Sequence, residues 1–302
     1  MEVILGSPRG FCAGVVRAID IVELALQRYG SPVYVRHEIV HNPFVVEELR
    51  GKGAIFVEEL DEVPDGQMVI FSAHGVSPEV RHEADRRSLR VLDATCPLVT
   101  KVHLEAIKYG GQEYTILLVG HREHPETIGT SGEAPDQTII VETVEDAQSV
   151  QVPDPERVAA LTQTTLSVDD TKEIVDALRE RFPNLLIRND ICYATTNRQM
   201  AAKSLAGDTD VVLVIGASNS SNCNRLREVV EAMGIPAHLV NGPDDLPEDA
   251  VTGAKRVGIV SGASTPESLV EAVVAKLEPS SIVARDVIDE DVTFVLPREL
   301  RD

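Results

Sequence analysis

The chain alternates short apolar runs with longer stretches of helical periodicity along almost its whole length. One such stretch places Val15, Ile19, Val22 and Leu26 on a single helix face. Alternating strands and helices imply parallel βαβ units whose helices pack on the faces of the sheets. Because one sheet of twelve strands exceeds the usual size at this length, we expect several small α/β domains. The expected strands are residues 2–6, 33–35, 54–57, 68–72, 89–92, 114–119, 138–141, 158–162, 185–188, 211–215, 237–240 and 256–261.

The composition is typical of a folded globular protein. Of the 302 residues, 43% are apolar and 25% are charged, which excludes a disordered tail. No apolar run approaches the roughly 20 residues that span a bilayer. The first residues also lack the basic and apolar regions of a secretory signal. We therefore expect a cytoplasmic enzyme or binding protein.

The charge balance and the cysteine content restrict the class of ligand and the kind of metal or redox site that the protein can have. Lys and Arg number 28 against 49 Asp and Glu, a formal net charge of −21. This excludes generic nucleic-acid binding, and it means that an anionic substrate must be held by local donors. The four cysteines are too few for a disulfide scaffold and form no C-x-x-C pair, so a zinc ribbon and a thioredoxin motif are excluded.

Five expected helix starts carry a polar residue followed by proline. Proline is favoured at the first helical position, and a small polar residue is favoured as the preceding cap. These starts follow strand ends, where α/β sheets bind ligands. Capping alone explains any single pair, but His and Cys are not favoured caps, so their presence indicates a site. The five polar residues are Asn42, Ser77, Cys96, His124 and Thr265.

Three cysteines recur at similar places in the pattern. Cys12, Cys96 and Cys192 are separated by 84 and 96 residues, and each stands after an apolar run and before a helix. Each is accompanied by two polar strand-end loops, which predicts three related α/β domains around a shared centre. The expected domains are residues 1–96, 97–192 and 193–281, followed by a tail of residues 282–302 that packs back on the body.

Three converging cysteines need a chemical reason. Thiolates are the standard ligands of iron–sulfur clusters, and three ligands on a four-iron cluster leave one iron open to substrate. The alternative is that each cysteine is a buried small hydrophobe, which is common. The spacing alone leaves both interpretations open.

Two loops with small hydroxyl and amide side chains suggest an anion site. Residues 216–222 and 262–266 each follow an apolar run and precede a helix, so their backbone N–H groups can form an anion nest. Neither is a Walker P-loop. Together with His41, His74 and His124 they favour a phosphate or diphosphate pocket, although each histidine could instead be structural. We expect the remaining histidines to be surface or structural residues: His37, His82, His103, His121 and His238.

Glu126 lies in the first turn of an expected helix. There a carboxylate is stabilised by the helix dipole, which is one explanation for it. In a desolvated pocket it could instead carry a proton. The sequence leaves the two explanations open.

Nine short motifs stand in a characteristic order and cover essentially the whole chain. They are residues 10–15, 37–42, 72–76, 93–97, 120–126, 162–167, 191–199, 219–222 and 262–264. In order and spacing they resemble the family of 4-hydroxy-3-methylbut-2-enyl diphosphate reductases, which catalyse the last step of the methylerythritol phosphate route to isoprenoids.

The resemblance implies three α/β domains in a pseudo-threefold trefoil around a [4Fe–4S] cluster. It implies that Cys12, Cys96 and Cys192 ligate three irons, while the fourth iron binds the allylic hydroxyl of the substrate. Seven side chains are expected to hold the diphosphate: His41, His74, His124, Ser220, Ser221, Asn222 and Ser264. Thr164 is also expected to bind the substrate.

The same resemblance implies the reaction. Glu126, assisted by Thr164, His124 and an ordered water, would deliver protons, and Thr195 would help to shape this network. The reaction is a reductive dehydroxylation with two electrons and two protons, giving isopentenyl and dimethylallyl diphosphate. The electron donor implied by the family is a ferredoxin or flavodoxin.

Two positions depart from the family pattern. Cys223 and Ala217 stand where serine is usual. Because a fourth cysteine ligand would close the cluster to substrate, we interpret Cys223 as a neutral substitution.

Two other functions are compatible with parts of the pattern. One is an open-cluster enzyme similar to quinolinate synthase, which would not require these diphosphate loops. The other is a non-catalytic iron–sulfur sensor or phosphometabolite-binding module. The presence of Glu126 and Thr164 with His124 favours turnover, because binding alone needs no proton donor.

Overall fold

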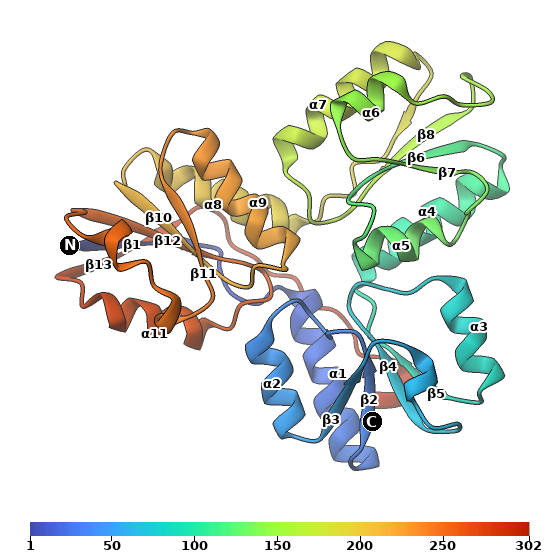
Figure 1. The fold of residues 1–302 in the computed structure, drawn as a ribbon, viewed down its shortest axis with the longest axis horizontal. Helices are drawn as coiled ribbons and strands as arrows, with labels where there is room; N and C mark the ends of the chain where they lie inside the picture. The colour runs from blue at the N-terminus through green and yellow to red at the C-terminus, as the bar shows by residue number, and fades with distance from the viewer. Residues whose placement is uncertain (302) are drawn as a thin grey trace. The chain divides into compact units, whose positions relative to one another are not determined.

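The computed structural model describes residues 1–301, in which three separate β-sheets form, each flanked by helices (Figure 1). Every strand pairing within these sheets is parallel. The chain divides into two compact units. The first contains Met1–Val16, His41–Val45 and Cys192–Thr293, and the second contains Arg17–Val40, Val46–Ile191 and the residues from Phe294 onward.

The first unit holds a five-stranded sheet in the order β11-β10-β12-β1-β13. Its strands are β1 (Glu2–Ser7), β10 (Val211–Ile215), β11 (Ala237–Val240), β12 (Arg256–Ser261) and β13 (Ser281–Asp286). Its helices are α8 (Tyr193–Ala206), α9 (Ser221–Ala232), η2 (Pro243–Asp245), α10 (Glu248–Val251) and α11 (Glu267–Leu277).

Alternating side chains of this sheet pack against helices on both faces. Leu213 and Ile215 face α11, whereas Val212 and Val214 face α8 and α9. Because both faces of the sheet are buried, strand β10 is apolar at every position. Parallel strands then direct all of their carboxyl ends to one edge of the sheet, where the loops begin.

The second unit holds two four-stranded sheets, in the orders β3-β2-β4-β5 and β7-β6-β8-β9. The strands of one are β2 (Val33–Arg36), β3 (Ala54–Val57), β4 (Met68–Phe71) and β5 (Arg90–Asp93). The strands of the other are β6 (Thr115–Val119), β7 (Thr138–Val141), β8 (Val158–Thr162) and β9 (Leu186–Ile187).

The helices of the second unit include η1 (Leu60–Glu62), α3 (Pro78–Arg86), α4 (Pro97–Gly111), α5 (Pro125–Ser131), α6 (Val144–Ser149), α7 (Val168–Arg181) and η3 (Arg298–Leu300). Two further helices, α1 (Ala13–Tyr29) and α2 (Pro43–Gly51), begin in the first unit and continue in the second. Within residues 1–301, no helix combines the length and the apolar character that a membrane crossing requires.

The predicted α/β class with three small domains is confirmed, and strands form at all twelve predicted places. The predicted proline starts hold for α2, α3, α4 and α5, whereas α11 begins one residue after Pro266. Helix α9 begins at Ser221, inside the segment of residues 216–222 that we expected to precede a helix. The arrangement of the domains as a trefoil around a cluster stays a prediction.

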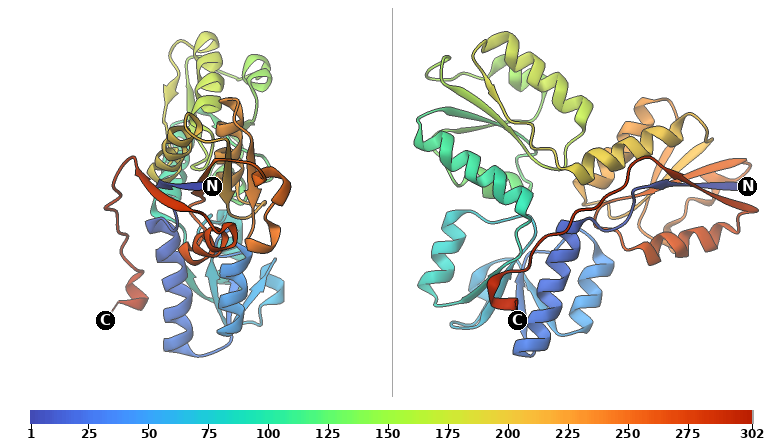
Figure 2. Two further views of the ribbon diagram at one scale, coloured as in Figure 1. Left: turned by 90° about the vertical axis from the view of Figure 1, so that its left-hand side faces the viewer. Right: turned by 180° about the vertical axis from the view of Figure 1, so that it is seen from behind.

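The sheet membership of the chain ends differs from the predicted boundaries. Strand β1 pairs with β12 and β13, so residues 2–7 belong to the sheet of the last domain and not to that of residues 33–93 (Figure 2). Residues 282–286, expected to begin a tail, belong instead to β13. Local periodicity marks a strand but not its partner, and these partners lie more than 250 residues apart along the chain.

Candidate active site

The second unit buries a carboxyl group at the carboxyl ends of its strands. Glu126, in the first turn of α5, is 2% exposed. The backbone N–H of Thr164 donates to Glu126 Oε1 at 2.6 Å, and the Thr164 hydroxyl donates to Oε2 at 3.0 Å. Thr164 follows β8, and α5 follows the neighbouring strand β6. The structure thus brings two predicted residues into contact from adjacent strand ends.

Burial governs the protonation of this carboxyl group. It raises the pKa of Glu126 to about 7, because the charged form loses its hydration. The two hydrogen bonds from Thr164 lower the pKa, and the negative charge of Asp190 raises it further. A carboxyl group with this pKa can give and take a proton near neutral pH. The geometry favours the proton-carrying interpretation of Glu126.

One histidine caps the helix that carries Glu126, and a second histidine contacts its ring. His124 caps α5, and its Nδ1 accepts from the backbone N–H of Glu126 at 3.2 Å, so the neutral ring carries its proton on Nε2. His74 Nδ1 lies 3.2 Å from the Ser72 hydroxyl. The two rings meet edge to face, with centroids 5.8 Å apart. Two imidazoles predicted to bind diphosphate therefore share one end of the second unit.

Cys96 belongs to the same group of loops. It is half-buried and stands at the N-cap of α4. Its backbone N–H donates to the Ala73 carbonyl at 3.0 Å, and its carbonyl accepts from the Thr100 N–H at 2.9 Å. The first bond ties Cys96 to the loop that carries His74.

Cys12 and Cys192 lie in the first unit, also at helix starts. Cys12 precedes α1, and its backbone N–H donates to the Ala263 carbonyl at 3.1 Å. Cys192 caps α8, where its Sγ accepts from the Thr195 N–H at 3.4 Å and lies 3.2 Å from the Thr195 hydroxyl. Helix N-termini favour the thiolate form of cysteine. All three predicted ligands stand at helix starts of this kind.

A buried arginine joins the segments that carry Cys12 and Cys192. Arg198, on α8, has a side chain 1% exposed. It donates to the Gly10 carbonyl at 2.7 Å and to Glu290 Oε1 at 3.0 Å. Because a buried cation is stable only with such partners, this network fixes the Cys12 loop against α8.

The two loops predicted to bind an anion follow β10 and β12. Gly216 follows β10 with φ +152°, a conformation that side chains rarely adopt. Thr265 donates through its hydroxyl to the Ile215 carbonyl at 2.9 Å, and Gly262 donates through its N–H to the same carbonyl at 3.1 Å. These bonds hold the two loops side by side at one edge of the sheet.

Asn222 is the side chain in these loops that most needs a ligand. It is 5% exposed, and neither its amide oxygen nor its amide nitrogen has a hydrogen-bond partner within the described chain. Leaving such a group unpaired costs about 1–3 kcal/mol. Ser220 caps α9, and the Ser264 hydroxyl donates to the His41 carbonyl at 3.1 Å. His41, Ser220, Asn222 and Ser264 thus share the first unit, together with Ser221 at the start of α9.

Cys223 differs from the other three cysteines. It is fully buried inside α9, and burial raises the pKa of its thiol, opposed by hydrogen bonds that include those from Ser220 and Thr265. A methyl group on Gly216 or Gly262 would overlap its sulfur. The thiol is therefore enclosed beneath the two loops, consistent with its interpretation as a substitute for serine.

The predicted residues divide between the units. The first unit holds Cys12, His41, Cys192, Ser220, Ser221, Asn222 and Ser264, and the second holds His74, Cys96, His124, Glu126 and Thr164. Within residues 1–301, no three His, Cys, Asp or Glu side chains are grouped as ligands of a single metal ion.

Three functional neighbours escaped the sequence interpretation. Asp190 acts on the charge of Glu126, and Arg198 and Glu290 form the network behind the Cys12 loop. Asp190 lies just before Ile191 and Cys192, and Arg198 lies within the motif of residues 191–199. The sequence at neither position indicates a functional role. Their partners are distant in sequence, so only the fold reveals them.

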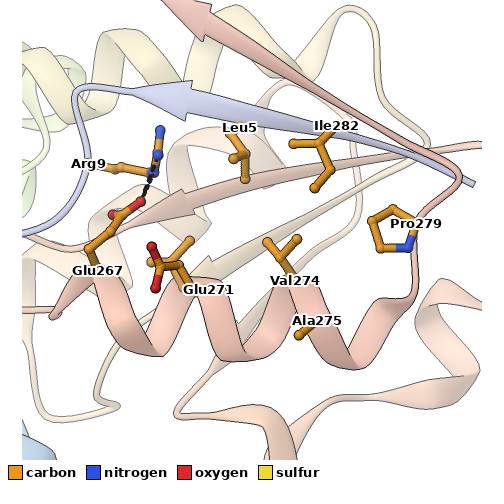
Figure 3. Close-up of a pocket in the computed structure, with 9 residues that line it drawn as sticks. Leu5, Arg9, Glu267, Glu271, Val274, Ala275, Pro279 and Ile282 are labelled. Carbon is orange, nitrogen blue, oxygen red and sulfur yellow. Dashed lines mark hydrogen bonds and ion pairs between the residues drawn. The ribbon is translucent and has the colours of Figure 1, made fainter.

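A groove in the first unit lies apart from the predicted site residues. An open groove of about 450 Å³ lies between α11 and strands β1 and β13 (Figure 3). Apolar side chains such as Leu5, Val274 and Ile282 line it, and Arg9 at one end is paired with Glu267 at 2.7 Å. No predicted site residue lines the groove, so it is not the candidate site.

Comparison with known families identifies the chain. A family model described as LytB protein matches residues 3–278. The chain belongs to the LytB family. The resemblance drawn from the nine motifs is thereby confirmed.

Curated relatives of this LytB family member carry the name 4-hydroxy-3-methylbut-2-enyl diphosphate reductase. The protein of Azoarcus sp. (strain BH72) is 56% identical over 306 residues, covering 100% of this chain and 98% of that protein. The protein of Pseudomonas putida (strain GB-1) is 54% identical over 310 residues, covering 100% of this chain and 98% of that protein.

Solved structures agree with this membership. The Plasmodium falciparum E-1-hydroxy-2-methyl-but-2-enyl-4-diphosphate reductase matches with a TM-score of 0.96 at 40% identity, covering 99% of this LytB chain and 96% of that one. A second reductase, described as the terminal enzyme of the non-mevalonate pathway, matches with a TM-score of 0.66 at 34% identity, covering 92% and 99% of the two chains.

Proposed function

We propose that the chain catalyses the reductive dehydroxylation of (E)-4-hydroxy-3-methylbut-2-enyl diphosphate to isopentenyl and dimethylallyl diphosphate. The observation that carries the proposal is the buried Glu126 carboxyl, whose pKa is about 7, in contact with Thr164 and beside His124. A binding module gains nothing from such a group, whereas a reaction that consumes protons requires one. The names of the curated relatives supply the substrate class.

Cys12, Cys96 and Cys192 would hold a [4Fe–4S] cluster. The donor set suits it, because these three thiols are half-buried at helix starts, whereas Cys223 is enclosed within α9. When bound, the cluster would supply electrons one at a time and an open Lewis-acidic iron for the substrate hydroxyl. Arg198 and Glu290 would keep the Cys12 loop and α8 in register for this purpose.

Neutral donors would hold the diphosphate despite the net charge of −21. The Asn222 amide nitrogen, buried without a partner in the described chain, can donate to a phosphate oxygen. Ser220, Ser221 and Ser264 add hydroxyl donors, and His41, His74 and His124 add imidazoles. Because the diphosphate is remote from the bond that breaks, its binding energy serves to orient the substrate.

Glu126 would deliver the proton that converts the allylic hydroxyl into water. Thr164 holds the carboxyl group by two hydrogen bonds, which fixes its direction. The balance is one C–O bond broken and one C–H bond formed, with two electrons and two protons consumed and one water released. Glu126 takes up protons again easily, because its pKa lies close to neutral pH.

The electrons must come from outside the chain. We propose a ferredoxin or flavodoxin as the donor, as the family resemblance implies. A one-electron carrier matches a centre that accepts electrons singly.

One experiment tests the proposal directly. The protein is prepared without oxygen, its iron and sulfide are measured, and it is mixed with the hydroxy-allylic diphosphate and a one-electron reductant. We expect consumption of two electrons for each substrate and formation of both products. If iron is bound but no substrate is consumed, the chain is an iron–sulfur sensor or binding module instead.

A further inference from the structure

His103, on α4, fills a junction between three segments of the second unit. It is 4% exposed. A Cβ built on Gly75 would lie 3.1 Å from His103 Nε2, and one built on Gly129 would lie 3.2 Å from its Cε1. The Gly129 Cβ would also lie 3.5 Å from the Gly75 carbonyl carbon. The edge of the ring therefore occupies the point where two backbones approach each other.

Both backbones carry predicted site residues. Gly75 directly follows His74, and Gly129 lies three residues after Glu126 on α5. At Gly75 the backbone has φ +81°, which excludes most side chains independently of the ring. His103 is thus the side chain against which the His74 loop and the Glu126 helix both rest.

The other edge of the ring is anchored. His103 Nδ1 lies 2.7 Å from Glu133 Oε1, and the Glu133 side chain is 10% exposed. Because the carboxylate accepts, Nδ1 carries the proton, and Nε2 is buried without a hydrogen-bond partner among the described residues. Burial lowers the pKa of His103, the charges of Glu133 and Asp93 oppose this, and Arg81 adds to it. The contact with Glu133 therefore fixes the orientation of the ring.

We propose that His103 is a positioning residue, which sets the separation of His74 and Glu126 by filling the space between Gly75 and Gly129. The inference rests on the proposed function of His74 and Glu126. In this proposal the shape of the ring edge, and not the charge of the ring, aligns His74, which binds diphosphate, with Glu126, which delivers the proton.

Two substitutions test the roles of the two ring edges separately. The amide nitrogen of Asn can replace Nδ1 toward Glu133 but leaves the junction open, whereas Gln reaches the junction and gives up the Glu133 bond. We expect His103→Asn to raise KM and lower kcat, with kcat/KM reduced about tenfold, because misplacement of about 1 Å is costly in catalysis. We expect His103→Gln to lower Tm but to keep kcat/KM within about threefold. The reverse ranking would overturn the proposal.

Substitution of a glycine tests the junction without changing the ring. In Gly129→Ala the new methyl presses on His103, so we expect kcat/KM to fall by about tenfold. In the His103→Asn background the same change should add less than about twofold, because the smaller side chain leaves room. Gly111→Ala, on α4 with nothing within 4 Å, is the matched control and should keep full activity. Additive losses at His103 and Gly129 would contradict the proposal.

Histidine-ring nitrogen NMR of the full chain separates this inference from the proposed function. His103→Asn should shift the ring resonances of His74 and His124, and His103→Gln should leave them near their original positions. If the wild-type chain proves inactive while these shifts appear, the proposed function fails and the positioning stands. If substrate is consumed but neither ring responds to His103→Asn, the positioning fails alone.

Discussion

The strand ends of the second unit bury an ionisable side chain, whereas those of the first unit bury short neutral ones. In the second unit, Glu126 is buried beneath the loops and its pKa is raised to about 7. In the first unit, Asn222 and Ser264 lie in the loops, and the amide of Asn222 is unpaired within the described chain. Both groups stand on parallel βα units, with loops that run from strand ends into helix N-termini.

The difference shows that one topology can bury an ionisable side chain in one place and a neutral amide in another. A helix N-terminus offers N–H groups and a partial positive charge in either place. In the second unit desolvation outweighs the hydrogen bonds to the carboxyl group, so Glu126 holds a proton near neutrality. The loops of residues 216–222 and 262–266 in the first unit contain no ionisable side chain, and the Asn222 amide nitrogen is unpaired among the described residues. The burial of one carboxyl group distinguishes the two sets of loops.

The largest expected effect is on turnover. Glu126→Gln keeps the shape, and its amide oxygen can accept from the Thr164 N–H while its amide nitrogen donates to the Thr164 hydroxyl oxygen. The change removes the acidic proton, so kcat should fall by about a thousandfold while substrate affinity and iron content stay unchanged. Steady-state kinetics and iron analysis measure this. Glu123→Gln, an exposed change in the same loop, is the control. An unaltered kcat in Glu126→Gln would show that the buried carboxyl group of the second unit does not serve proton transfer.

The second effect is on the pH dependence of stability. The folded pKa of Glu126, about 7, exceeds the ordinary value of 4.5, so the folded state keeps its proton where the unfolded state loses it. Its contribution to the free energy of unfolding is complete below pH 4.5 and is lost as pH rises through 7, a change of about 3 kcal/mol. Denaturant titrations should show that the free energy of unfolding decreases less from pH 5 to pH 8 in Glu126→Gln than in the wild type. Equal decreases would mean that the carboxyl group is solvated.

The third effect concerns the unpaired amide of the first unit. Asn222→Ala should weaken binding of inorganic diphosphate by about tenfold without lowering Tm, because the free protein loses an unsatisfied group. Calorimetric binding and thermal unfolding measure the two quantities. Asn224→Ala is the contrast, since that amide donates to the Ser218 and Ser220 carbonyls at 2.7 and 3.0 Å and its loss should lower Tm. A decrease in Tm alone for Asn222→Ala would assign Asn222 a structural role.

The smallest effect is expected at Cys223. Serine can accept the same hydrogen bonds, so Cys223→Ser should change the free energy of unfolding by about 1 kcal/mol or less and leave iron content intact. Cys192→Ser should abolish iron binding. An iron-free Cys223→Ser protein would show that the thiol beneath the loops is a ligand.

Much of the framework was predictable from local sequence. Apolar runs gave twelve strands because buried parallel strands are apolar on both faces. Proline marked four helix starts because it fits only where no N–H is needed. The motifs also indicated Glu126 and Thr164 before their contact was seen.

Other features could not be read along the chain. The partners of β1, the network of Arg198 with Glu290 and the junction at His103 all join segments that are far apart in sequence. His103 was expected to be a surface or structural residue, since an isolated histidine in a helical pattern gives no indication of its contacts.

The sequence by itself determined the α/β class, the places of the strands and the family, because periodicity, proline and motif spacing act over short ranges. The tertiary structure alone decided that Glu126 is dehydrated, that Asn222 lacks a partner within the described chain and that β13 completes a sheet with β1. The physical reason is that solvation and pairing depend on which distant groups exclude water from a side chain. That property belongs to the folded chain and not to any stretch of it.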